Sequence, residues 1–317
     1  MAELTPRYLP KPAQVRGDPA QILPKTGVVV IPRKELTRKH HLTTTISART
    51  DHSLERSSTV PWMKRVELGI PLRDGNSGNT VYLVGDTVRR DAKPWSATID
   101  ALLLHLESIG YSGSPRALGY DELGRQVLSF VPGRVAPDPS DLTETEIRHV
   151  GRLIREFHDA SASFSSPPEA VWNVAIAANA EELICHHDLA PWNLVRGENT
   201  MVFIDWDGAG PGSRLWDLTY AAHGFTPLSP RSELDSRTLK LRLRALVDGY
   251  ELSEFQRTIF ISLLAPRIYS MYQLLHLGHS GNVEPWASLW SKEHGTIWLE
   301  DHDFTKNHLR WWFEALE

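Results

Sequence analysis

The stretch CHHDLAPWN, residues 185–193, places two histidines, one aspartate and one asparagine within nine residues. Short apolar runs flank it, Glu182–Cys185 on one side and Met201–Ile204 on the other, and each is typical of a β-strand. Loops that connect strands commonly carry catalytic groups. We therefore expect a strand pair that presents the aspartate and the asparagine of the first loop beside Asp205, which follows the second run.

Asp188, Asn193 and Asp205 offer only oxygen atoms as ligands, which suits magnesium and poorly suits zinc. Magnesium needs only one or two protein carboxylates when phosphate oxygens complete its coordination, so the expected second partner is a nucleotide. One carboxylate then remains to accept a proton from an attacking hydroxyl. The three side chains together favour phosphoryl transfer.

Composition is that of an ordinary globular protein. With 317 residues, 41% hydrophobic and 23% charged, the chain is long enough for one or two domains and for an enzyme. Its single cysteine, Cys185, permits no internal disulfide and no thiolate cage for zinc, which favours the cytoplasm as its compartment. The sequence has neither an apolar run long enough to span a bilayer nor a secretion signal at its start, so we expect no membrane partner.

Charge is distributed unevenly along the chain. Residues 1–60 contain ten Lys and Arg against five Asp and Glu, which leaves 24 against 34 for residues 61–317. An acidic body argues against nucleic acid as a partner and is compatible with a small-molecule substrate. The oligomeric state cannot be predicted from these features.

Three regions follow from the patterning. Residues 1–60 carry six prolines and a basic cluster and are predicted to be a mostly irregular extension. Residues 61–131 are predicted to form strands with one helix, and residues 132–317 a mainly helical part that includes the CHHDLAPWN loop. Two lobes joined by a hinge would create a cleft.

Individual elements can be predicted from periodicity and turn residues. A helix is expected between Pro94 and Gly110, and a second one should begin at a capping box formed by Thr143 and Glu146. Helices are expected from residue 215 onward, with a kink at Pro266. The expected strands cover residues 66–70, 80–84, 87–89, 116–120 and 126–130.

The motif His186-His187-Asp188-x-x-x-x-Asn193, followed by Ile204-Asp205-Trp206-Asp207, resembles the H-x-D-x-x-x-x-N and I-D motifs of the aminoglycoside phosphotransferase and choline kinase-like superfamily. The resemblance covers roughly residues 66 to 225. It implies an α+β, bilobal protein-kinase-like fold, with a small β-rich N-lobe that carries one helix and a larger, mainly helical C-lobe.

The resemblance also implies an activity. The expected enzyme is a small-molecule kinase that uses Mg²⁺ and ATP or GTP to phosphorylate a hydroxyl of an aminoglycoside-like antibiotic, nucleoside, sugar or amino alcohol. Residue by residue, it implies a structural role for His186, a proton acceptor in Asp188, magnesium ligands in Asn193 and Asp205, and a brace of the catalytic loop in Asp217. Asp207 either binds a second magnesium or only anchors its turn.

The upstream lobe would bind the nucleotide. The small residues Gly75, Asn76, Ser77 and Gly78 would let backbone N–H groups approach phosphates. Strand side chains alternate, so Val88 and Arg90 share one face, where Val88 would contact adenine and Arg90 would take the place of the family's lysine. The segment that would pair with adenine through its backbone contains Ser129, Phe130 and Val131.

Other interpretations of the same residues remain open at this point. Arg90, and the lack of a well-placed partner glutamate in the following helix, are compatible with a non-catalytic nucleotide-binding pseudokinase. A metal-dependent hydrolase built on His186, His187 and Asp188 is a more distant alternative, because adjacent histidines on an extended chain point to opposite faces. The acidic run at residues 300–303 could attract a polycationic substrate, but a solvated helix start is the simpler interpretation.

Overall fold

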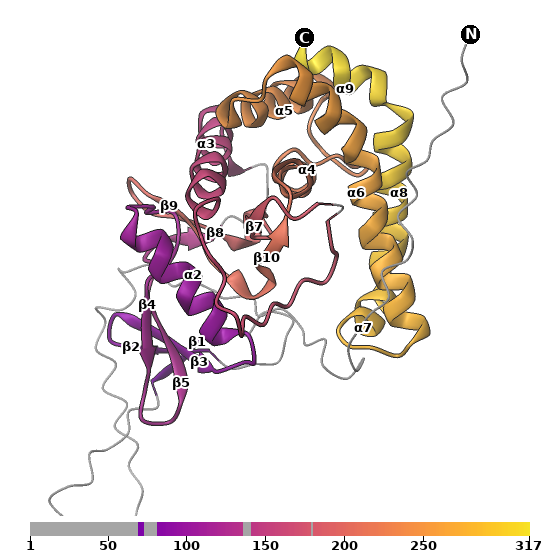
Figure 1. Ribbon diagram of the computed structural model, residues 1–317. Coiled ribbons are helices and arrows are strands. Elements are labelled where there is room, and N and C mark those ends of the chain that lie inside the picture. The colour runs from indigo at the N-terminus through magenta and orange to yellow at the C-terminus, as the bar shows by residue number, and fades with distance from the viewer. Residues whose placement is uncertain (1–68, 73–80, 136–140, 179) are drawn as a thin grey trace, which may run out of the picture.

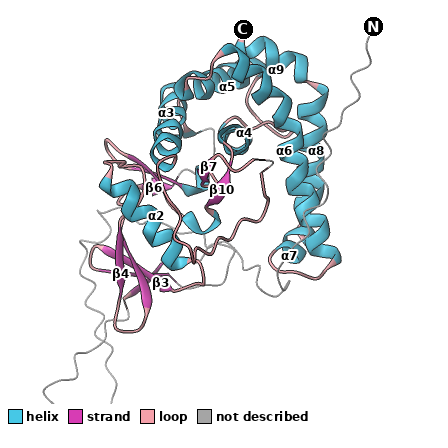
Figure 2. Ribbon diagram, viewed as in Figure 1, coloured by secondary structure: helices cyan, strands magenta, loops and turns pink. Residues whose placement is uncertain are grey.

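The computed structural model describes residues 69–72, 81–135, 141–178 and 180–317 (Figure 1). A small antiparallel sheet lies at one end of the molecule, and a larger part with most of the helices and several short strands lies at the other (Figure 2). This arrangement confirms the predicted α+β, bilobal fold. The expected extension at residues 1–60 and the expected phosphate-binding segment at residues 75–78 lie outside the described residues.

The N-terminal sheet has the strand order β1-β2-β3-β5-β4, and all of its neighbours are antiparallel. The observed bounds lie within two residues of the predicted runs where both can be compared. The strands are β1 (Ile70–Leu72), β2 (Val81–Val84), β3 (Thr87–Asp91), β4 (Ala117–Tyr120) and β5 (Arg125–Ser129).

The helix that the structure describes in this lobe, α2 (Ser96–Ser108), connects β3 to β4 and lies between the sheet and the helical part (Figure 1). Its apolar residues recur at intervals of three and four, as predicted, and the four residues of that stripe are completely buried. They are Ile99, Leu102, Leu103 and Leu106. Burial of each contributes about 1.5 to 3 kcal/mol.

The C-terminal part combines long helices with short strands. Its helices are α3 (Glu144–Ser161), α4 (Arg214–Phe225), α5 (Ser236–Tyr250), α6 (Glu254–Ser280), α7 (Trp286–Ser291), α8 (His294–Asn307) and α9 (Leu309–Leu316). Figure 1 shows α4 along its axis, enclosed by α3, α5 and α6, so the residues on α4 face neighbours on several sides.

The short strands form two small ladders beneath these helices. One pairs β7 (Leu183–Cys185) with β10 (Gly210–Gly212), and the other has the order β6 (Arg134–Val135), β8 (Leu194–Arg196), β9 (Met201–Phe203). The sequence predicted β7 and β9 but not β6, β8 or β10. The expected pairing of β7 with β9 is wrong, because β7 pairs with β10 and β9 pairs with β8. The missed strands have two or three residues each and include Gly-Pro-Gly, so they show no alternation of apolar and polar residues.

The helix starts follow their sequence signals. Thr143 forms the predicted capping box with Glu146, because the Thr143 side chain accepts from the Glu146 amide while the Glu146 carboxylate accepts from the Thr143 amide. Helix α6 runs without interruption from Glu254 to Ser280 and includes the exposed Pro266, where the sequence predicted a kink. The structure therefore has one long helix that contains this proline.

Helices α3 and α5 approach each other very closely at two glycines. A Cβ atom added to Gly151 would collide with the carbonyl oxygen of Leu246, and one added to Gly249 would collide with that of Arg148. Since both obstacles are backbone atoms, side-chain rotation cannot relieve either clash. This contact fixes the position of α3, which supplies His158 to the site described below.

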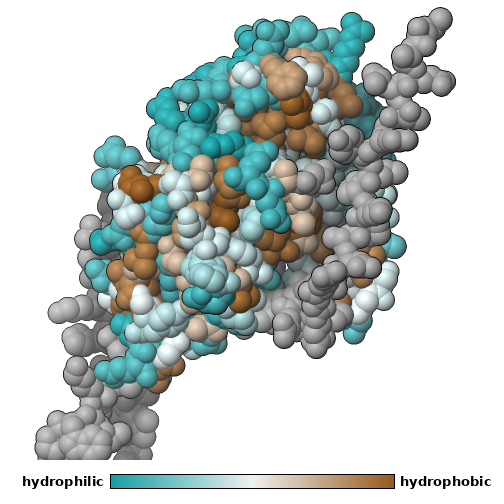
Figure 3. All heavy atoms as spheres, in the orientation of Figure 1, coloured by the Kyte–Doolittle hydropathy of each residue, from teal (hydrophilic) through white to brown (hydrophobic). Residues whose placement is uncertain are grey.

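No helix in the described part of the chain combines the length and the apolarity needed to cross a bilayer. On the face drawn in Figure 3, hydrophilic residues gather along the upper left edge, where Figure 1 places α3 and α5. Hydrophobic residues show toward the middle of that face.

We predict that Gly249→Ala lowers the free energy of unfolding by about 1 to 3 kcal/mol, because the added methyl group forces α3 and α5 apart. Urea denaturation measures the change. Gly281→Ala is the matched control: its Cβ would lie 3.3 Å from the nearest atom, and its loss should be clearly smaller. Equal losses in the two variants would contradict the close contact.

Candidate functional site

The loop at residues 186–193 is positioned by strands on both sides. Strand β7 leads into it and is fixed by pairing with β10, in which Cys185 lies opposite Gly210. At its far end, the carbonyl oxygen of Asn193 accepts a hydrogen bond of 2.8 Å from the amide of Ile204. This bond ties the loop to the residue that precedes Asp205.

The buried carboxylate of Asp217, in the first turn of α4, fixes the start of the loop. Its two oxygens accept hydrogen bonds of 2.9 Å from the backbone amides of His186 and His187, and a third bond of 3.2 Å links it to Nε2 of His158. Although burial alone would raise the pKa of Asp217, the hydrogen bond and charge of His158 hold it well below its usual range. The carboxylate therefore stays ionised.

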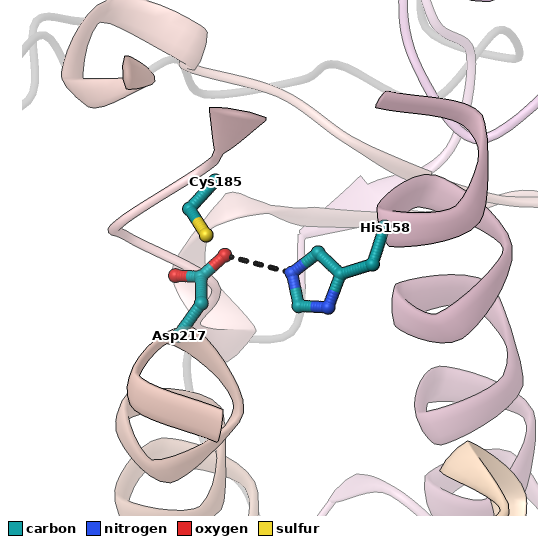
Figure 4. A group of neighbouring side chains, drawn as sticks. All are labelled: His158, Cys185 and Asp217. Carbon is teal, nitrogen blue, oxygen red and sulfur yellow. Dashed lines mark hydrogen bonds and ion pairs between the residues drawn. The ribbon is translucent and has the colours of Figure 1, made fainter. Parts of the chain in front are cut away.

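Figure 4 shows His158, from α3, pointing toward Asp217, with the thiol of Cys185 beside them. These three side chains lie close enough together to hold a metal ion. Hydrogen bonds already take up the carboxylate oxygens and both nitrogens of His158, whose Nδ1 lies 2.8 Å from the hydroxyl of Tyr250. Burial raises the pKa of the Cys185 thiol well above its usual value. The group is therefore a packed brace, and Cys185 is a small buried residue within it.

Asp188 and Asn193 contact each other directly. Nδ2 of Asn193 donates to the Asp188 carboxylate at 2.8 Å and to its backbone oxygen at 3.0 Å, so Oδ1 is the Asn193 atom that can take a cation. The second carboxylate oxygen of Asp188 accepts a bond of 2.7 Å from the hydroxyl of Tyr220. Burial and the adjacent Asp188 raise the pKa of Tyr220 well above its usual value, so this hydroxyl keeps its proton.

The segment at Asp205 is held in an unusual conformation. Asp205 has φ 61° and ψ 61°, the left-handed region, which redirects the chain at the end of β9. Just before it, Nε2 of His186 lies 3.2 Å from the carbonyl oxygen of Ile204, and the His186 ring packs against Trp206 with 4.7 Å between centroids. His186 thus links the two loops.

Three of the four ring nitrogens of the two adjacent histidines are directed to backbone groups. Nδ1 of His186 accepts from the amide of Asp188, and Nε2 of His187 lies 3.1 to 3.2 Å from the carbonyl oxygens of Gly210 and Pro211, whereas Nδ1 of His187 has no hydrogen-bond partner among the described residues. Because backbone contacts engage both nitrogens of His186, the two rings do not join Asp188 on one ion, which disfavours the metal-dependent hydrolase. His187 is buried, and it also lines a cavity.

Arg90 is at the centre of a buried polar chain. Its Nη2 lies 2.5 Å from the Asp207 carboxylate, and its Nε donates to Gln126, which donates in turn to Asp100 on α2. Burial alone would lower the pKa of Arg90, but the carboxylates of Asp207 and Asp205 raise it, so the residue is a permanent cation. Asp100 is thus connected to Arg90 through Gln126. A search of the sequence for a glutamate that pairs directly with Arg90 could not find this connection. Glu107, also on α2, pairs with Arg116 at the surface.

Two cavities open beside these loops, and Asp205 lines both. The smaller has about 40 Å³, room for a few water molecules, and lies between the sheet and the loops. Of the predicted nucleotide-binding residues, it is lined by Val88, Arg90, Ser129, Phe130 and Val131.

The larger cavity has about 430 Å³ and is lined by Asp188, Asn193 and Asp205, the three residues that the sequence predicted to meet. Trp192, 42% exposed, lines it too, whereas Trp206 lies buried beneath the loop. Tyr220 was missed. It follows Asp217 by three residues on α4, so both share one helix face, and this spacing could have indicated it.

The acidic run at residues 300–303 is not a solvated helix start. It lies inside α8, and Asp301 is buried, paired with Arg231 and with His223 at 2.9 Å. Glu300 also pairs with Arg231. None of the four residues lines the larger cavity. Its position on the helix directs Asp301 toward His223 and Arg231, which are distant from it in sequence.

Solved structures define the class of fold. The structure aligns with a choline/ethanolamine kinase family protein from Mesorhizobium loti, with a TM-score of 0.52 and 16% identity over 78% of this chain and 93% of that one. It aligns with an amicoumacin kinase in complex with AMP-PNP, Ca²⁺ and its ligand, with a TM-score of 0.54 and 12% identity over 72% and 86%. The protein has a protein-kinase-like fold.

Sequence comparison gives the family. Residues 167–239 match the phosphotransferase enzyme family. The chain is 32% identical over 248 residues to the trifolitoxin immunity protein of Rhizobium leguminosarum bv. trifolii, an alignment that spans 72% of this chain and 94% of that relative. The chain belongs to the phosphotransferase enzyme family, as the motifs predicted.

We predict that Asp217→Asn lowers the free energy of unfolding at pH 7 by about 3 kcal/mol, because the amide cannot serve as an anionic acceptor for two backbone amides and His158. The native pKa of Asp217 lies below that of the unfolded chain, about 3.9. Its stabilisation is therefore present above about pH 4 and is lost as the pH falls through the native pKa.

Urea denaturation between pH 7 and pH 3 should therefore show a constant difference between the wild type and Asp217→Asn down to about pH 4 and a smaller difference at pH 3. The control is Asp235→Asn, which replaces an exposed N-cap residue of α5 by another good cap and should change stability little. A constant difference between wild type and Asp217→Asn across this range would contradict the assigned ionisation.

Proposed function

We propose that the protein is a magnesium-dependent phosphotransferase that moves the γ-phosphate of ATP or GTP to a hydroxyl of a small molecule. The observation that carries this proposal is the meeting of Asp188, Asn193 and Asp205 on the wall of one cavity of about 430 Å³. Family membership supports it. Phosphoryl transfer depends mainly on positioning and charge stabilisation, which this arrangement supplies.

Asp188 is the proposed proton acceptor. Hydrogen bonds from Asn193 and Tyr220, one to each carboxylate oxygen, fix its orientation toward the cavity. An acceptor hydroxyl placed within hydrogen-bond reach would transfer its proton to this carboxylate as it attacks the γ-phosphate. Tyr220 keeps Asp188 in position and is not itself proposed to exchange protons.

The site fits a hard divalent cation such as magnesium, since Asn193 and Asp205 offer oxygen atoms on the same cavity wall. When bound, such an ion neutralises phosphate charge and orients the transferred group. Asn193 and Asp205 are the residues that would hold it. Of the two roles left open for Asp207, its ion pair with Arg90 favours the anchoring one.

The smaller cavity is the proposed nucleotide site. Val88 would contact the adenine, and Arg90 would contact phosphate oxygens, together with the backbone at residues 75–78. The amides of Ser129 and Phe130 already donate to the carbonyl oxygens of Arg116 and Asp86. Val131 is therefore the proposed residue whose N–H meets the base. Since the cavity holds about 40 Å³, nucleotide entry requires the lobes to separate.

We predict that Asp188→Ala lowers the rate of phosphate transfer by about a hundredfold to ten thousandfold, because the hydroxyl loses its proton acceptor. Nucleotide affinity should remain within a few fold, since Asp188 lies in the larger cavity and not in the smaller one. ADP release measured against aminoglycosides, nucleosides, sugars and amino alcohols identifies an acceptor. Transfer at the wild-type rate in Asp188→Ala would refute the proposed role.

Arg90→Met provides the complementary variant, in which the KM for the nucleotide should rise. A thermal-shift titration with ATP and magnesium measures nucleotide binding, which both a kinase and a pseudokinase should show. Binding of the nucleotide without ADP release for any hydroxyl compound would favour a pseudokinase over a kinase.

Protection of the cell from a toxin is a second candidate function, supported by the 32% identity with the trifolitoxin immunity protein. We predict that expression of this chain in a trifolitoxin-sensitive strain raises the toxin concentration needed to stop growth. If protection requires phosphate transfer, Asp188→Ala abolishes it, whereas protection that persists in this variant indicates binding alone. Equal sensitivity with and without the wild-type chain would exclude protection against this toxin.

A further inference from the structure

Arg267, on α6, is a buried cation on the wall of the larger cavity. The residue is only 2% exposed, and its side chain lines the same cavity as Asp188, Tyr220 and Trp298. Removing a charge from water is costly unless partners replace the hydration. The partners of this guanidinium therefore decide whether it has a structural role alone.

The protein supplies few of those partners. Nη1 donates to the hydroxyl of Ser270 at 3.2 Å, but Nε and Nη2 make no hydrogen bond to any residue that the structure describes. No carboxylate among those residues lies within 4.0 Å of the guanidinium. Burial lowers the pKa of Arg267, and the more distant Asp217 and Asp188 offset only part of that effect.

The other buried arginines in the described chain are compensated. Arg90 pairs with Asp207, Arg125 pairs with Asp121, and Arg242 donates to the backbone oxygens of Phe225 and Leu142. Arg267 differs from them, because its buried charge has one weak hydroxyl partner.

Two aromatic rings lie against the guanidinium of Arg267 instead. The guanidinium carbon lies 4.5 Å from the ring centroid of Tyr220 and 5.3 Å from that of Trp216. Rings contact the face of a guanidinium, while its N–H groups point outward in its plane. Nε and Nη2 form the edge that binds a carboxylate with two parallel hydrogen bonds. The unpartnered edge is therefore the one suited to a planar anion.

The rest of the cavity wall does not favour a cationic ligand. Its acidic residues are Asp188 and Asp205, both at the end where phosphate transfer is proposed. Burial, together with Lys292, lowers the pKa of His294, which makes this lining residue neutral near pH 7. Most of the remaining wall is apolar and includes Ile176, Trp192, Met271, Leu274, Trp286, Leu289 and Trp298.

We propose that the acceptor of this enzyme carries a carboxylate, which Arg267 binds while Asp188 receives the proton of the acceptor's hydroxyl. This inference rests on the proposed phosphotransferase function and narrows its substrate class to hydroxy acids with an apolar body. Tyr220 sets the spacing, since its ring lies against Arg267 and its hydroxyl bonds to Asp188. The carboxylate and the hydroxyl are therefore separated by about the length of one aromatic side chain.

Three matched alcohols test this proposal by binding. The probes are 4-(hydroxymethyl)benzoate, its neutral amide 4-(hydroxymethyl)benzamide, and the cationic 4-(hydroxymethyl)benzylamine, which share one ring and one hydroxyl. Isothermal titration of the full chain without nucleotide should give the acid at least about tenfold tighter binding than the amide. The amine should bind more weakly than either.

Arg267→Met should abolish the preference for the acid over the amide. Arg267→Lys keeps the charge but lacks the planar pair of donors, so it should keep a reduced preference, and it serves if the methionine variant does not fold. Arg257→Met, which removes an arginine from the same helix outside the cavity, is the matched control and should leave the acid-to-amide ratio unchanged. A purely structural role for Arg267 predicts the same loss for acid and amide.

Equal or tighter binding of the amide or the amine overturns the proposal, as does a preference that survives in Arg267→Met, or no binding of the acid at millimolar concentration. ADP release with the same probes separates this outcome from failure of the proposed function. Acid-selective, Arg267-dependent binding without ADP release would support the carboxylate site and count against phosphotransfer. Turnover of amines in preference to acids would support phosphotransfer and count against the carboxylate site.

Discussion

The candidate site depends on one buried carboxylate. Asp217 accepts hydrogen bonds from two consecutive backbone amides, those of His186 and His187, and is itself linked to His158 on α3. Backbone amides cannot move independently of the chain, so this contact fixes the direction in which the loop leaves β7. The close packing of α3 against α5 matters for the same reason, because it sets where His158 lies.

The sequence was sufficient to predict the fold and the members of the loop because both depend on local order. Alternation in the strands, the apolar stripe of α2 and the capping box at Thr143 act within a few residues, and each was observed. The H-x-D-x-x-x-x-N spacing predicted that Asp188, Asn193 and Asp205 would meet, and they line one cavity.

The parts that could not be predicted depend on contacts between distant segments. Gln126 connects Arg90 to Asp100 only because β5 pairs with β3 in one particular register. Arg267 reaches the cavity from a helix that begins some sixty residues after the loop, at a position with no motif around it. Periodicity shows that such a residue is buried but not what it faces. The sequence therefore predicted residues at the proposed phosphate end of the site and left the proposed acceptor end open.

The ion pair between Arg90 and Asp207 joins the β-sheet lobe to the loop after β9 and excludes water from both groups. Arg90 has thus already lost its hydration in this structure. Under the proposed function, a phosphate that reaches Arg90 would exchange one anionic oxygen for another, so the dehydration penalty usual for a surface cation would not arise at that step. Asp207 would then have to reorganise, so that release of its carboxylate, and not capture of a cation, would accompany the proposed nucleotide entry.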